Sequence, residues 1–467
     1  MVALTGRASV MVAHVIGGAL IALAGYPALA MAADTAPEIA WKDRVEVAAG
    51  DAYRGPWRMN DSEFRYVDDP SIALDDDGDA GVIWADQENQ DLYFQRYGAA
   101  GEPKFDEPVN VSGSPGIFSW LPRVVLSRHE PDHVYVLWQE IIFSGGSHGG
   151  ETLFARSTDG GRTFGDPINL SETTAGAGKG RLTTHRWDNG SLDIVEAPEG
   201  TLHVAWTEYE GALRFARSTD GGETFSEPRR IAGGEDALPA RGPSLAADEQ
   251  GSVYLAWTVG EDQTADIRLT ASRDAGETFK EPRVVAATQG HADAPKIALD
   301  AEGVVHLVYM ESADGPFQPA RVHYTRGRGG DGFHEPMDIS AEHGERFDSV
   351  AFPSLAVAGE SVYVLWELFP DAARRPSGLG LVRSHDGGER FSAPETVPGT
   401  DDTRLGFNGS LQGLLMRKLA VNEAGDVAIV NSTLEQGEGS YVLLIRGTRT
   451  ATDSGAVHDT SSDVSQR

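Results

Sequence analysis

Along most of this chain, one pattern recurs every 54 to 61 residues. Each copy contains an alternating apolar run that often begins with proline, a second run that ends in an aromatic residue, and a third run. A glycine turn and a Phe-x-x-Pro segment then lead into a short fourth run. The spacing is that of the prolines in this segment, which are Pro108, Pro167, Pro228, Pro282, Pro336 and Pro394. Four strand-like runs in each copy predict four-stranded antiparallel sheets repeated around an axis, as in a β-propeller.

The length of the chain excludes a simple sandwich around one core. The chain has 467 residues, whereas single hydrophobic cores stop growing at roughly 250 to 300 residues. A repeat architecture solves this problem because each sheet needs to bury its faces only against its neighbours. We therefore expect residues 33–450 to form one all-β propeller. Residues 451–467 lack apolar periodicity and are expected to be a disordered tail.

The last copy of the repeat is incomplete. After six full copies, the chain contains three more runs, at Leu414–Val421, Asp426–Val430 and Tyr441–Ile445. The segment Trp41–Ala48 (WKDRVEVA) resembles the fourth run of another copy, Phe225–Ala232 (FSEPRRIA). We predict that this N-terminal strand completes the last sheet. The result is a propeller of seven blades, each with four antiparallel strands, without free sheet edges.

One aromatic residue ends the second run in each of the six complete copies. Because it follows an alternating apolar run, we predict that it packs between neighbouring blades. The alternative is a ring of platforms on which sugars stack. The six residues are Trp84, Trp138, Trp206, Trp257, Tyr309 and Trp366.

The charge and the residue types exclude several classes of partner. The 39 Lys and Arg residues and 71 Asp and Glu residues give a formal net charge of −32, which repels nucleic-acid phosphates and anionic lipid. The absence of cysteine excludes disulfides, thiolate metal sites and a cysteine nucleophile. His291 and Asp293 have metal-ligand chemistry, but two ligands do not make a metal site. We expect a monomer with no cofactor, no bound metal and no nucleic-acid partner.

The first 32 residues have the features of a secretory signal peptide. They contain one charged residue, Arg7, followed by the apolar run Val10–Ala24 and small residues around Ala30 and Ala32, where cleavage is expected. The alternative is an uncleaved membrane anchor. We predict an exported protein, periplasmic or extracellular, with no membrane span after cleavage. Its mature charge would be −33, from 38 positive and 71 negative residues.

Four copies contain a glycine turn of the form S-x-D-x-G-x-(T/R)-F between the third and fourth runs. The aspartate can accept hydrogen bonds from the backbone of its own turn, the glycines permit positive φ, and the phenylalanine can be buried under the sheet. This pattern resembles the Asp box, or BNR repeat, of the sialidase-like β-propeller superfamily, and the resemblance extends over residues 41–447. The four aspartates are Asp159, Asp220, Asp274 and Asp386.

The resemblance implies a protein that acts on glycans, most directly a glycoside hydrolase of the exo-sialidase type. Two alternatives stay open: a polysaccharide lyase of the BNR propeller type, and a propeller that binds a glycan or a protein without catalysis. In this superfamily the boxes lie on the face opposite the active site, so we predict structural roles for their aspartates. We interpret Asp75–Asp79 (DDDGD) likewise as a hairpin turn rather than a calcium loop.

Long loops between the second and third runs, and between copies, are expected on the face opposite these turns. They supply arginines that could hold the carboxylate of a sugar by paired hydrogen bonds. Arg65 departs from the superfamily pattern Phe/Tyr-Arg-Ile-Pro, because four residues separate it from Pro70. The predicted substrate-binding residues are Arg65, Arg186, Arg241 and Arg346.

The densest set of candidate catalytic residues belongs to the third copy. His185 can act as a base near neutral pH, Tyr209 offers a phenol, and Glu208 offers a carboxylate that could prime the phenol. With Arg186, they could act on a glycosidic oxygen or on the acidic proton beside a uronate carboxylate. The alternative is that His185 and Tyr209 are ordinary loop residues and that Glu208 caps backbone groups.

Overall fold

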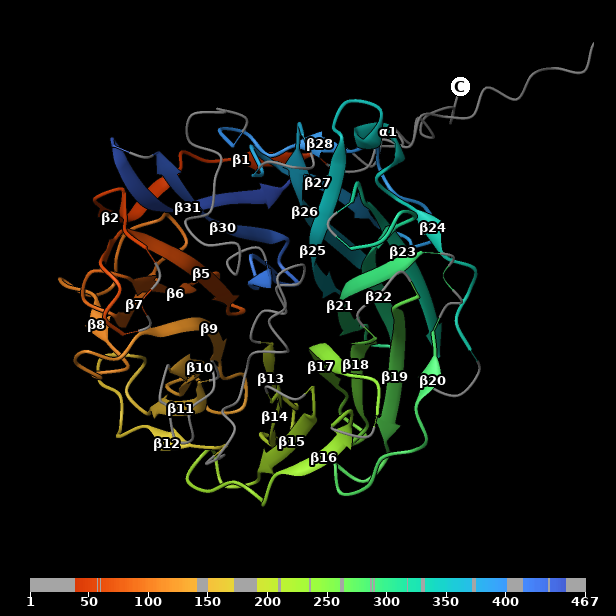
Figure 1. Cartoon of the computed structure of the whole chain (residues 1–467), viewed down its shortest axis with the longest axis horizontal. Helices are drawn as coiled ribbons and strands as arrows, with labels where there is room; N and C mark the ends of the chain where they lie inside the picture. The colour runs from red at the N-terminus through yellow and green to blue at the C-terminus, as the bar shows by residue number, and fades with distance from the viewer. Residues whose placement is uncertain are drawn as a thin grey trace, which may run out of the picture. The chain divides into compact units, whose positions relative to one another are not determined.

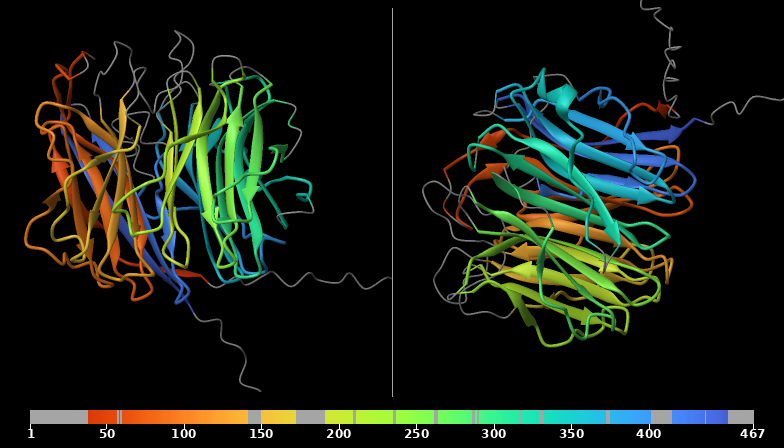
Figure 2. Two further views of the ribbon diagram at one scale, coloured as in Figure 1. Left: turned by 90° about the horizontal axis from the view of Figure 1, so that it is seen from below. Right: turned by 90° about the vertical axis from the view of Figure 1, so that its right-hand side faces the viewer.

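The computed structural model describes residues 38–450 with gaps, and the described part is all β except for one helical turn. The gaps are residues 57, 59, 141–149, 172–190, 209–210, 235–236, 261–263, 286–287, 289, 317, 329–331, 372–374, 401–414 and 436. Seven antiparallel sheets form blades around a central axis (Figure 1). The strands run between the two faces of this ring (Figure 2). The predicted seven-bladed propeller is confirmed.

The first six blades each use four consecutive strands, and we number the blades in chain order. Blade 1 contains β5 (Val67–Leu74), β6 (Ala80–Asp86), β7 (Asp91–Tyr97) and β8 (Val109–Asn110). Blade 2 contains β9 (Ser119–Leu126), β10 (Val134–Glu140), β11 (Glu151–Ser157) and β12 (Ile168–Asn169). Blade 3 contains β13 (Leu192–Glu196), β14 (Leu202–Thr207), β15 (Leu213–Ser218) and β16 (Arg229–Ala232).

Blade 4 contains β17 (Ala240–Ala247), β18 (Val253–Val259), β19 (Asp266–Ser272) and β20 (Arg283–Val284). Blade 5 contains β21 (His291–Leu299), β22 (Val304–Ser312), β23 (Arg321–Arg328) and β24 (Met337–Asp338). Blade 6 contains β25 (Ser349–Ala358), β26 (Ser361–Phe369), β27 (Leu379–Ser384) and β28 (Glu395–Thr396). The only helix in the described ranges, α1 (Ala341–Gly344), precedes blade 6, and no described helix is long and apolar enough to cross a membrane.

Blade 7 is built from both ends of the described chain. Its strands are β29 (Leu419–Val421), β30 (Asp426–Glu435), β31 (Gly439–Arg449), β1 (Ile39–Trp41) and β2 (Val45–Gly50). Both N-terminal strands pair with β31, so that Trp41 lies opposite Gly447 and Val45 lies opposite Leu444. Figure 1 shows β1 beside β31. The predicted closing strand is confirmed, although it is divided into two short strands. A two-stranded sheet of β3 (Tyr53–Arg54) and β4 (Phe64–Arg65) precedes blade 1.

The hydrophobic core is a ring of interfaces between blades. Trp138 belongs to a cluster with Ile83 and Phe94 of blade 1, and Trp206 belongs to one with Tyr135 of blade 2. All six aromatic residues that end the second strands are at most 3 % exposed. The predicted packing role is therefore confirmed, and none of the six is an open platform for a sugar.

Each glycine turn joins the third and fourth strands of its blade. In blade 3, Oδ1 of Asp220 accepts hydrogen bonds from the backbone N–H groups of Glu223 and Thr224, and Oδ2 accepts one from the Thr224 hydroxyl. Phe225 packs edge-on against Phe154 of blade 2, with ring centroids 4.9 Å apart. The turn thus fixes its own backbone, as its residue types predicted, and its phenylalanine also joins two blades.

The acidic run Asp75–Asp79 is a hairpin turn, as predicted. Oδ1 of Asp75 accepts the backbone N–H of Asp79 at 2.8 Å, and Oδ2 binds Arg96. Asp79 pairs with Lys104 at 3.0 Å. Basic side chains therefore occupy these carboxylates. Within the described ranges, no three His, Asp or Glu side chains lie together as metal ligands would.

The innermost strands of five blades share a break directly before a proline. At each break, the residue before the proline has a positive φ and the register with the second strand shifts. Such a bulge bends the strand and changes the direction of the side chains on either side of it. The five residues are Asp69 (φ 49°), Leu121 (φ 55°), Gly242 (φ 61°), Ala294 (φ 54°) and Phe352 (φ 54°).

Candidate functional site

Because successive strands of a blade run in opposite directions, the loops that connect them lie on two faces of the ring. The first hairpin of each blade and the glycine turn lie at the same end of the strands, and we call this end the turn face. The connections between second and third strands, and between blades, lie at the other end, which we call the loop face. Five second strands end at the loop face in or next to an acidic residue. These residues are Asp86, Glu140, Glu208, Glu311 and Glu435.

Glu140 is enclosed within blade 2. It is 2 % exposed, and Oε1 accepts hydrogen bonds from the Trp138 indole and from the hydroxyl groups of Ser114 and Ser119. Burial raises the pKa of Glu140, and these hydrogen bonds act in the opposite direction. Because one carboxylate oxygen already accepts three hydrogen bonds from blade 2 and the segment before it, its contacts are those of a structural residue.

Glu208, a predicted catalytic residue, is bound by an arginine of the next strand. Its two carboxylate oxygens accept hydrogen bonds from Nε and Nη2 of Arg214 at 2.9 and 3.1 Å. The backbone N–H of Gly211 donates to the carbonyl of Glu208 and closes a tight turn. This paired contact gives Glu208 an anchoring position at the start of the turn. The other predicted members of the group, His185, Arg186 and Tyr209, lie outside the described residues.

Arg241, a predicted substrate-binding residue, is buried in a charged group between blades 4 and 5. Its Nη2 lies 3.1 Å from Oδ2 of Asp293 and 3.3 Å from Nε2 of His291. The hydroxyl of Thr258 donates to Oδ1 of Asp293. Burial alone would raise the pKa of Asp293. The charges and hydrogen bonds of Arg241 and His291 nevertheless hold that pKa far below its usual range. The Asp293 side chain is 24 % exposed, so an ionised carboxylate reaches solvent at the loop face.

The other two described arginines have partners elsewhere in the ring. Arg65, in β4, pairs with Asp51 at 3.2 Å and lies over the ring of Tyr53. Arg346 follows α1, and its guanidinium carbon lies 5.7 Å from the ring centroid of Phe347. Each of these arginines thus has its own local partners, in a different part of the ring from the Arg241 group.

A second group of polar residues, which the sequence analysis did not identify, lies at the start of blade 1. Tyr66 is 2 % exposed, and the side chain of Gln87 donates to Oδ1 of Asp68 at 2.8 Å. Burial raises the pKa of the Tyr66 phenol well above its usual value, and Asp68 raises it further. The guanidinium groups of Arg54 and Arg375 act in the opposite direction. A neutral phenol therefore lies within electrostatic reach of a carboxylate and two arginines.

One sequence signal links the two groups. Asp68, Arg241 and Asp293 each lie two residues before a proline that opens an innermost strand, directly before the residue with positive φ. These side chains lie at the loop-face ends of innermost strands, directly beside the bulge. The prolines marked the strand starts in the sequence, but a residue before proline is normally extended. The bulge, and with it the grouping, was therefore not predicted.

Comparison with known proteins establishes the fold. No protein-family profile matches the chain, and no curated protein sequence matches it. It is similar to the solved structure of a PL25 polysaccharide lyase, an ulvan lyase bound to -[GlcA(1-4)Rha3S]-, with 12% identity, a TM-score of 0.55, and coverage of 86% of this chain and 95% of that chain. It is also similar to the polysaccharide lyase Uly1, with 11% identity, a TM-score of 0.52, and coverage of 88% and 100%. These identities are low, so the likeness shows a shared fold and not a shared reaction.

Proposed function

We propose that this protein cleaves a polysaccharide that carries a carboxylate, by the elimination reaction of polysaccharide lyases, on its loop face. The observation that carries the proposal is the likeness, over nearly the whole of both chains, to a lyase described with a GlcA-containing ligand. The group around Tyr66 has a phenol and two arginines, and the group around Asp293 has a carboxylate that can accept hydrogen bonds from a sugar. The predicted signal peptide is consistent with an extracellular or periplasmic polysaccharide.

Elimination at a uronate requires a base, an acid and cations. The base removes the proton beside the carboxylate, the electron pair of that C–H bond forms a carbon–carbon double bond, and the bond to the leaving sugar oxygen breaks. That oxygen takes up a proton from the acid. Cations near the carboxylate stabilise the charge that develops during proton removal.

The Tyr66 group supports two of these roles. Tyr66 would keep its proton at neutral pH, as a phenol of ordinary or raised pKa does, and could donate it to the leaving oxygen. Arg54 and Arg375 would bind the sugar carboxylate, since arginine pairs with carboxylates through two parallel hydrogen bonds. His185 stays, as predicted from the sequence, the candidate for the base that removes the proton, with Tyr209 as a further predicted catalytic residue and Arg186 as a predicted substrate-binding residue.

Asp293 supports recognition of a neutral part of the substrate. Its ionised carboxylate accepts hydrogen bonds only, has Arg241 and His291 as neighbours, and reaches solvent. Sugar hydroxyl groups are donors that such a carboxylate can bind. We place the hydroxyl groups of the sugar chain against Asp293.

A sialidase-type hydrolase receives less support from the same residues. Hydrolysis of that type, as the resemblance implied it, uses a tyrosine primed by a glutamate. Here the carboxylate of Glu208 is bound through both oxygens by Arg214. We therefore propose that Glu208 positions the turn from Glu208 to Gly211 rather than priming a nucleophile.

The test is incubation of the purified mature protein with uronate-containing polysaccharides. A lyase releases reducing ends together with the ultraviolet absorbance of an unsaturated uronate. Reducing ends without that absorbance would identify a hydrolase and overturn the proposal. Saturable binding without either product would identify a noncatalytic propeller.

The role of Tyr66 is tested with a matched pair of variants. We expect Tyr66→Phe to lower kcat about 100-fold or more, because it removes the proton donor and conserves the ring. Tyr53→Phe, an exposed tyrosine in the adjacent small sheet, should keep the activity of the unmodified protein. Equal activity of the two variants would remove Tyr66 from the site.

A further inference from the structure

The central channel contains a cavity that the proposed function does not use. Its volume is about 460 Å³, within the range of roughly 300 to 1,000 Å³ that is typical of ligand pockets. Residues of the first hairpins, among them Arg128, Glu196 and Glu249, line one end. First hairpins lie on the turn face, so the cavity extends toward the face opposite the proposed polysaccharide site.

At the other end of the cavity, side chains contact the described residues that lead into β29. The side chains of Arg123 and Lys296 donate to the carbonyl of Leu415 at 3.2 and 3.3 Å, and Arg123 also contacts the sulfur of Met416. The hydroxyl of Ser354 donates to the carbonyl of Met416. Residues 415–416 therefore lie beside the Arg123 and Lys296 end of the cavity, which we call its floor.

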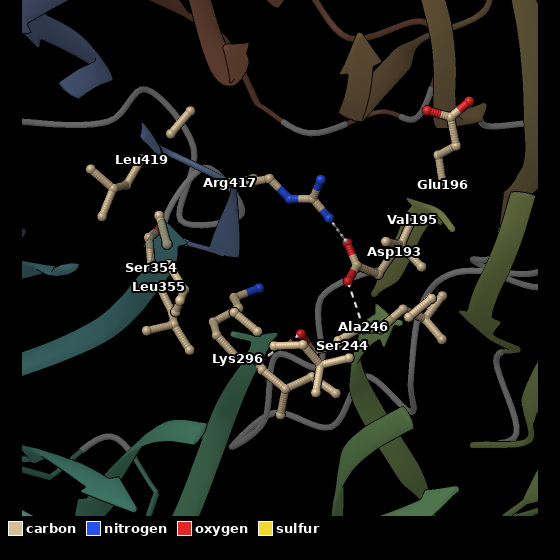
Figure 3. A pocket seen from close by; sticks show the side chains of 18 of the residues that line it. Asp193, Val195, Glu196, Ser244, Ala246, Lys296, Ser354, Leu355, Arg417 and Leu419 are labelled. Atoms are coloured by element: carbon tan, nitrogen blue, oxygen red, sulfur yellow. Dashed lines mark hydrogen bonds and ion pairs between the residues drawn. The ribbon is translucent and has the colours of Figure 1, made fainter. Parts of the chain in front are cut away.

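The floor has more positive than negative groups. Arg123, Lys296 and Arg417 lie around the carboxylate of Asp193. Figure 3 shows Lys296, Arg417 and Asp193. Nη2 of Arg417 lies 2.7 Å from Oδ1 of Asp193, whose other oxygen accepts the backbone N–H of Leu245. Asp193 thus has a partner on each oxygen, and together with Asp69, whose charge acts on Arg123, it leaves one of the three cations unbalanced. The nearby Lys418 forms its own buried ion pair with Glu367 and adds no net charge.

Two of these cations have donors available for a ligand. An ammonium group has three N–H donors. Among the described residues, Lys296 donates one hydrogen bond, to the carbonyl of Leu415. Arg417 binds Asp193 and the carbonyl of Ile194 through Nη2 alone, and its side chain is 30 % exposed within the channel. Burial, followed by repulsion from Arg123, lowers the pKa of Lys296 to about 7, and Asp193 acts in the opposite direction. An anion would relieve this repulsion.

Between the floor and the charged residues Arg128, Glu196 and Glu249 at the other end, the walls of the cavity contain a group of aliphatic side chains. Val195, Ala298, Leu355 and Ala356 line it and are partly exposed. Ser244 and Ser354 of the adjacent innermost strands are uncharged. A ligand that satisfies both floor and walls has an oxyanion at one end and an apolar body at the other.

We propose that the central channel binds a small aliphatic carboxylate from the turn face, with its oxyanion held by Lys296 and Arg417. Phosphate shares the oxyanion chemistry but lacks the apolar body, so it should bind more weakly. The site is independent of the proposed lyase reaction, and either proposal can fail without the other.

The test is calorimetric titration of the mature protein with hexanoate, acetate and phosphate. We expect hexanoate to bind more tightly than acetate or phosphate. Binding should be stronger at pH 6 than at pH 8, because Lys296 loses its proton between them. Lys296→Met should weaken hexanoate at least about tenfold and remove the pH dependence. Ala298→Phe, which fills the cavity without touching the cations, should also abolish binding.

The matched control is Lys280→Met, which removes an exposed lysine between β19 and β20. It should bind hexanoate as the unmodified protein does. If Lys296→Met does not fold, Arg417→Gln takes its place, because that side chain is partly exposed. No heat with any probe, or equal binding by the Lys296 and Lys280 variants, would overturn the proposal. Binding of phosphate but not hexanoate would show an inorganic-anion site and overturn the choice of ligand.

Discussion

At the scale of single residues, the aspartate of a glycine turn acts as a cap on backbone donors. Removing it by Asp220→Ala leaves two backbone N–H groups and the Thr224 hydroxyl without their acceptor. We expect a loss of about 1 kcal/mol of unfolding free energy, as for other side-chain caps, because the turn is exposed and water replaces part of the contact. Activity per folded molecule should not change. Thr219→Ala, at the exposed neighbouring position, is the control.

The same aspartate makes a prediction about pH. Hydrogen bonds overcome the opposing effect of burial and lower the pKa of Asp220 to about 2, below its value of roughly 3.9 in an unfolded chain. The contribution of Asp220 to stability is therefore complete above about pH 4 and is lost as the pH falls toward 2. Urea denaturation should show that the difference between Asp220→Ala and the unmodified protein shrinks between pH 6 and pH 3. A constant difference would contradict the capping role.

The sequence predicted those residues whose partners are local. The turn aspartates and the second-strand tryptophans follow from motif and periodicity alone, and both were found as predicted. Tyr66, in contrast, is affected by Arg375 from the far side of the sequence. Arg214, from the adjacent strand, forms an ion pair with Glu208. Such pairings depend on side-chain geometry across the ring, which no spacing in the chain reveals.

At the scale of the element, the bulge before each strand-opening proline bends the innermost strand near the loop face. Gly242 has room for a Cβ, since its nearest contact would be Pro295 Cδ at 3.7 Å. Gly242→Ala should therefore lower the unfolding free energy by only about 1 kcal/mol, the cost of holding an alanine at a φ of 61°. Ala294→Gly should cost less than Ala246→Gly, since Ala294 alone has a positive φ and both side chains are buried. Equal losses in thermal unfolding would show that the left-handed residues are unstrained.

Strand positions followed from alternation, but some boundaries did not. A run from Leu414 was predicted to begin the first strand of blade 7, whereas β29 starts at Leu419. The carbonyl of Leu415, before this strand, accepts hydrogen bonds from Arg123 and Lys296. Apolar alternation could not distinguish a strand from the segment beside the cavity floor, because both are buried.

At the scale of the whole molecule, the ring is closed by strands from opposite ends of the chain. Because blade 7 borrows β1 and β2, the incomplete last repeat was enough to predict closure from the sequence. The channel floor was not predictable, since its cations come from blades 2, 5 and 7 and meet only when the ring has closed. The same closure explains why an acidic chain can hold a local excess of positive charge at its centre.

The closing strands should therefore control the stability of the entire ring. Deleting residues 38–50 would expose the edge of β31 and remove Ile39 and Val45 from their apolar clusters. The buried Ile39 contributes roughly 1.5 to 3 kcal/mol and the partly buried Val45 less than that, so we expect a loss of at least about 2 kcal/mol and increased aggregation through the free edge. Deleting residues 451–467, predicted as a tail, should leave the melting temperature unchanged. Thermal unfolding of both truncations checks this, and equal melting temperatures would mean that closure by β1 and β2 does not stabilise the propeller.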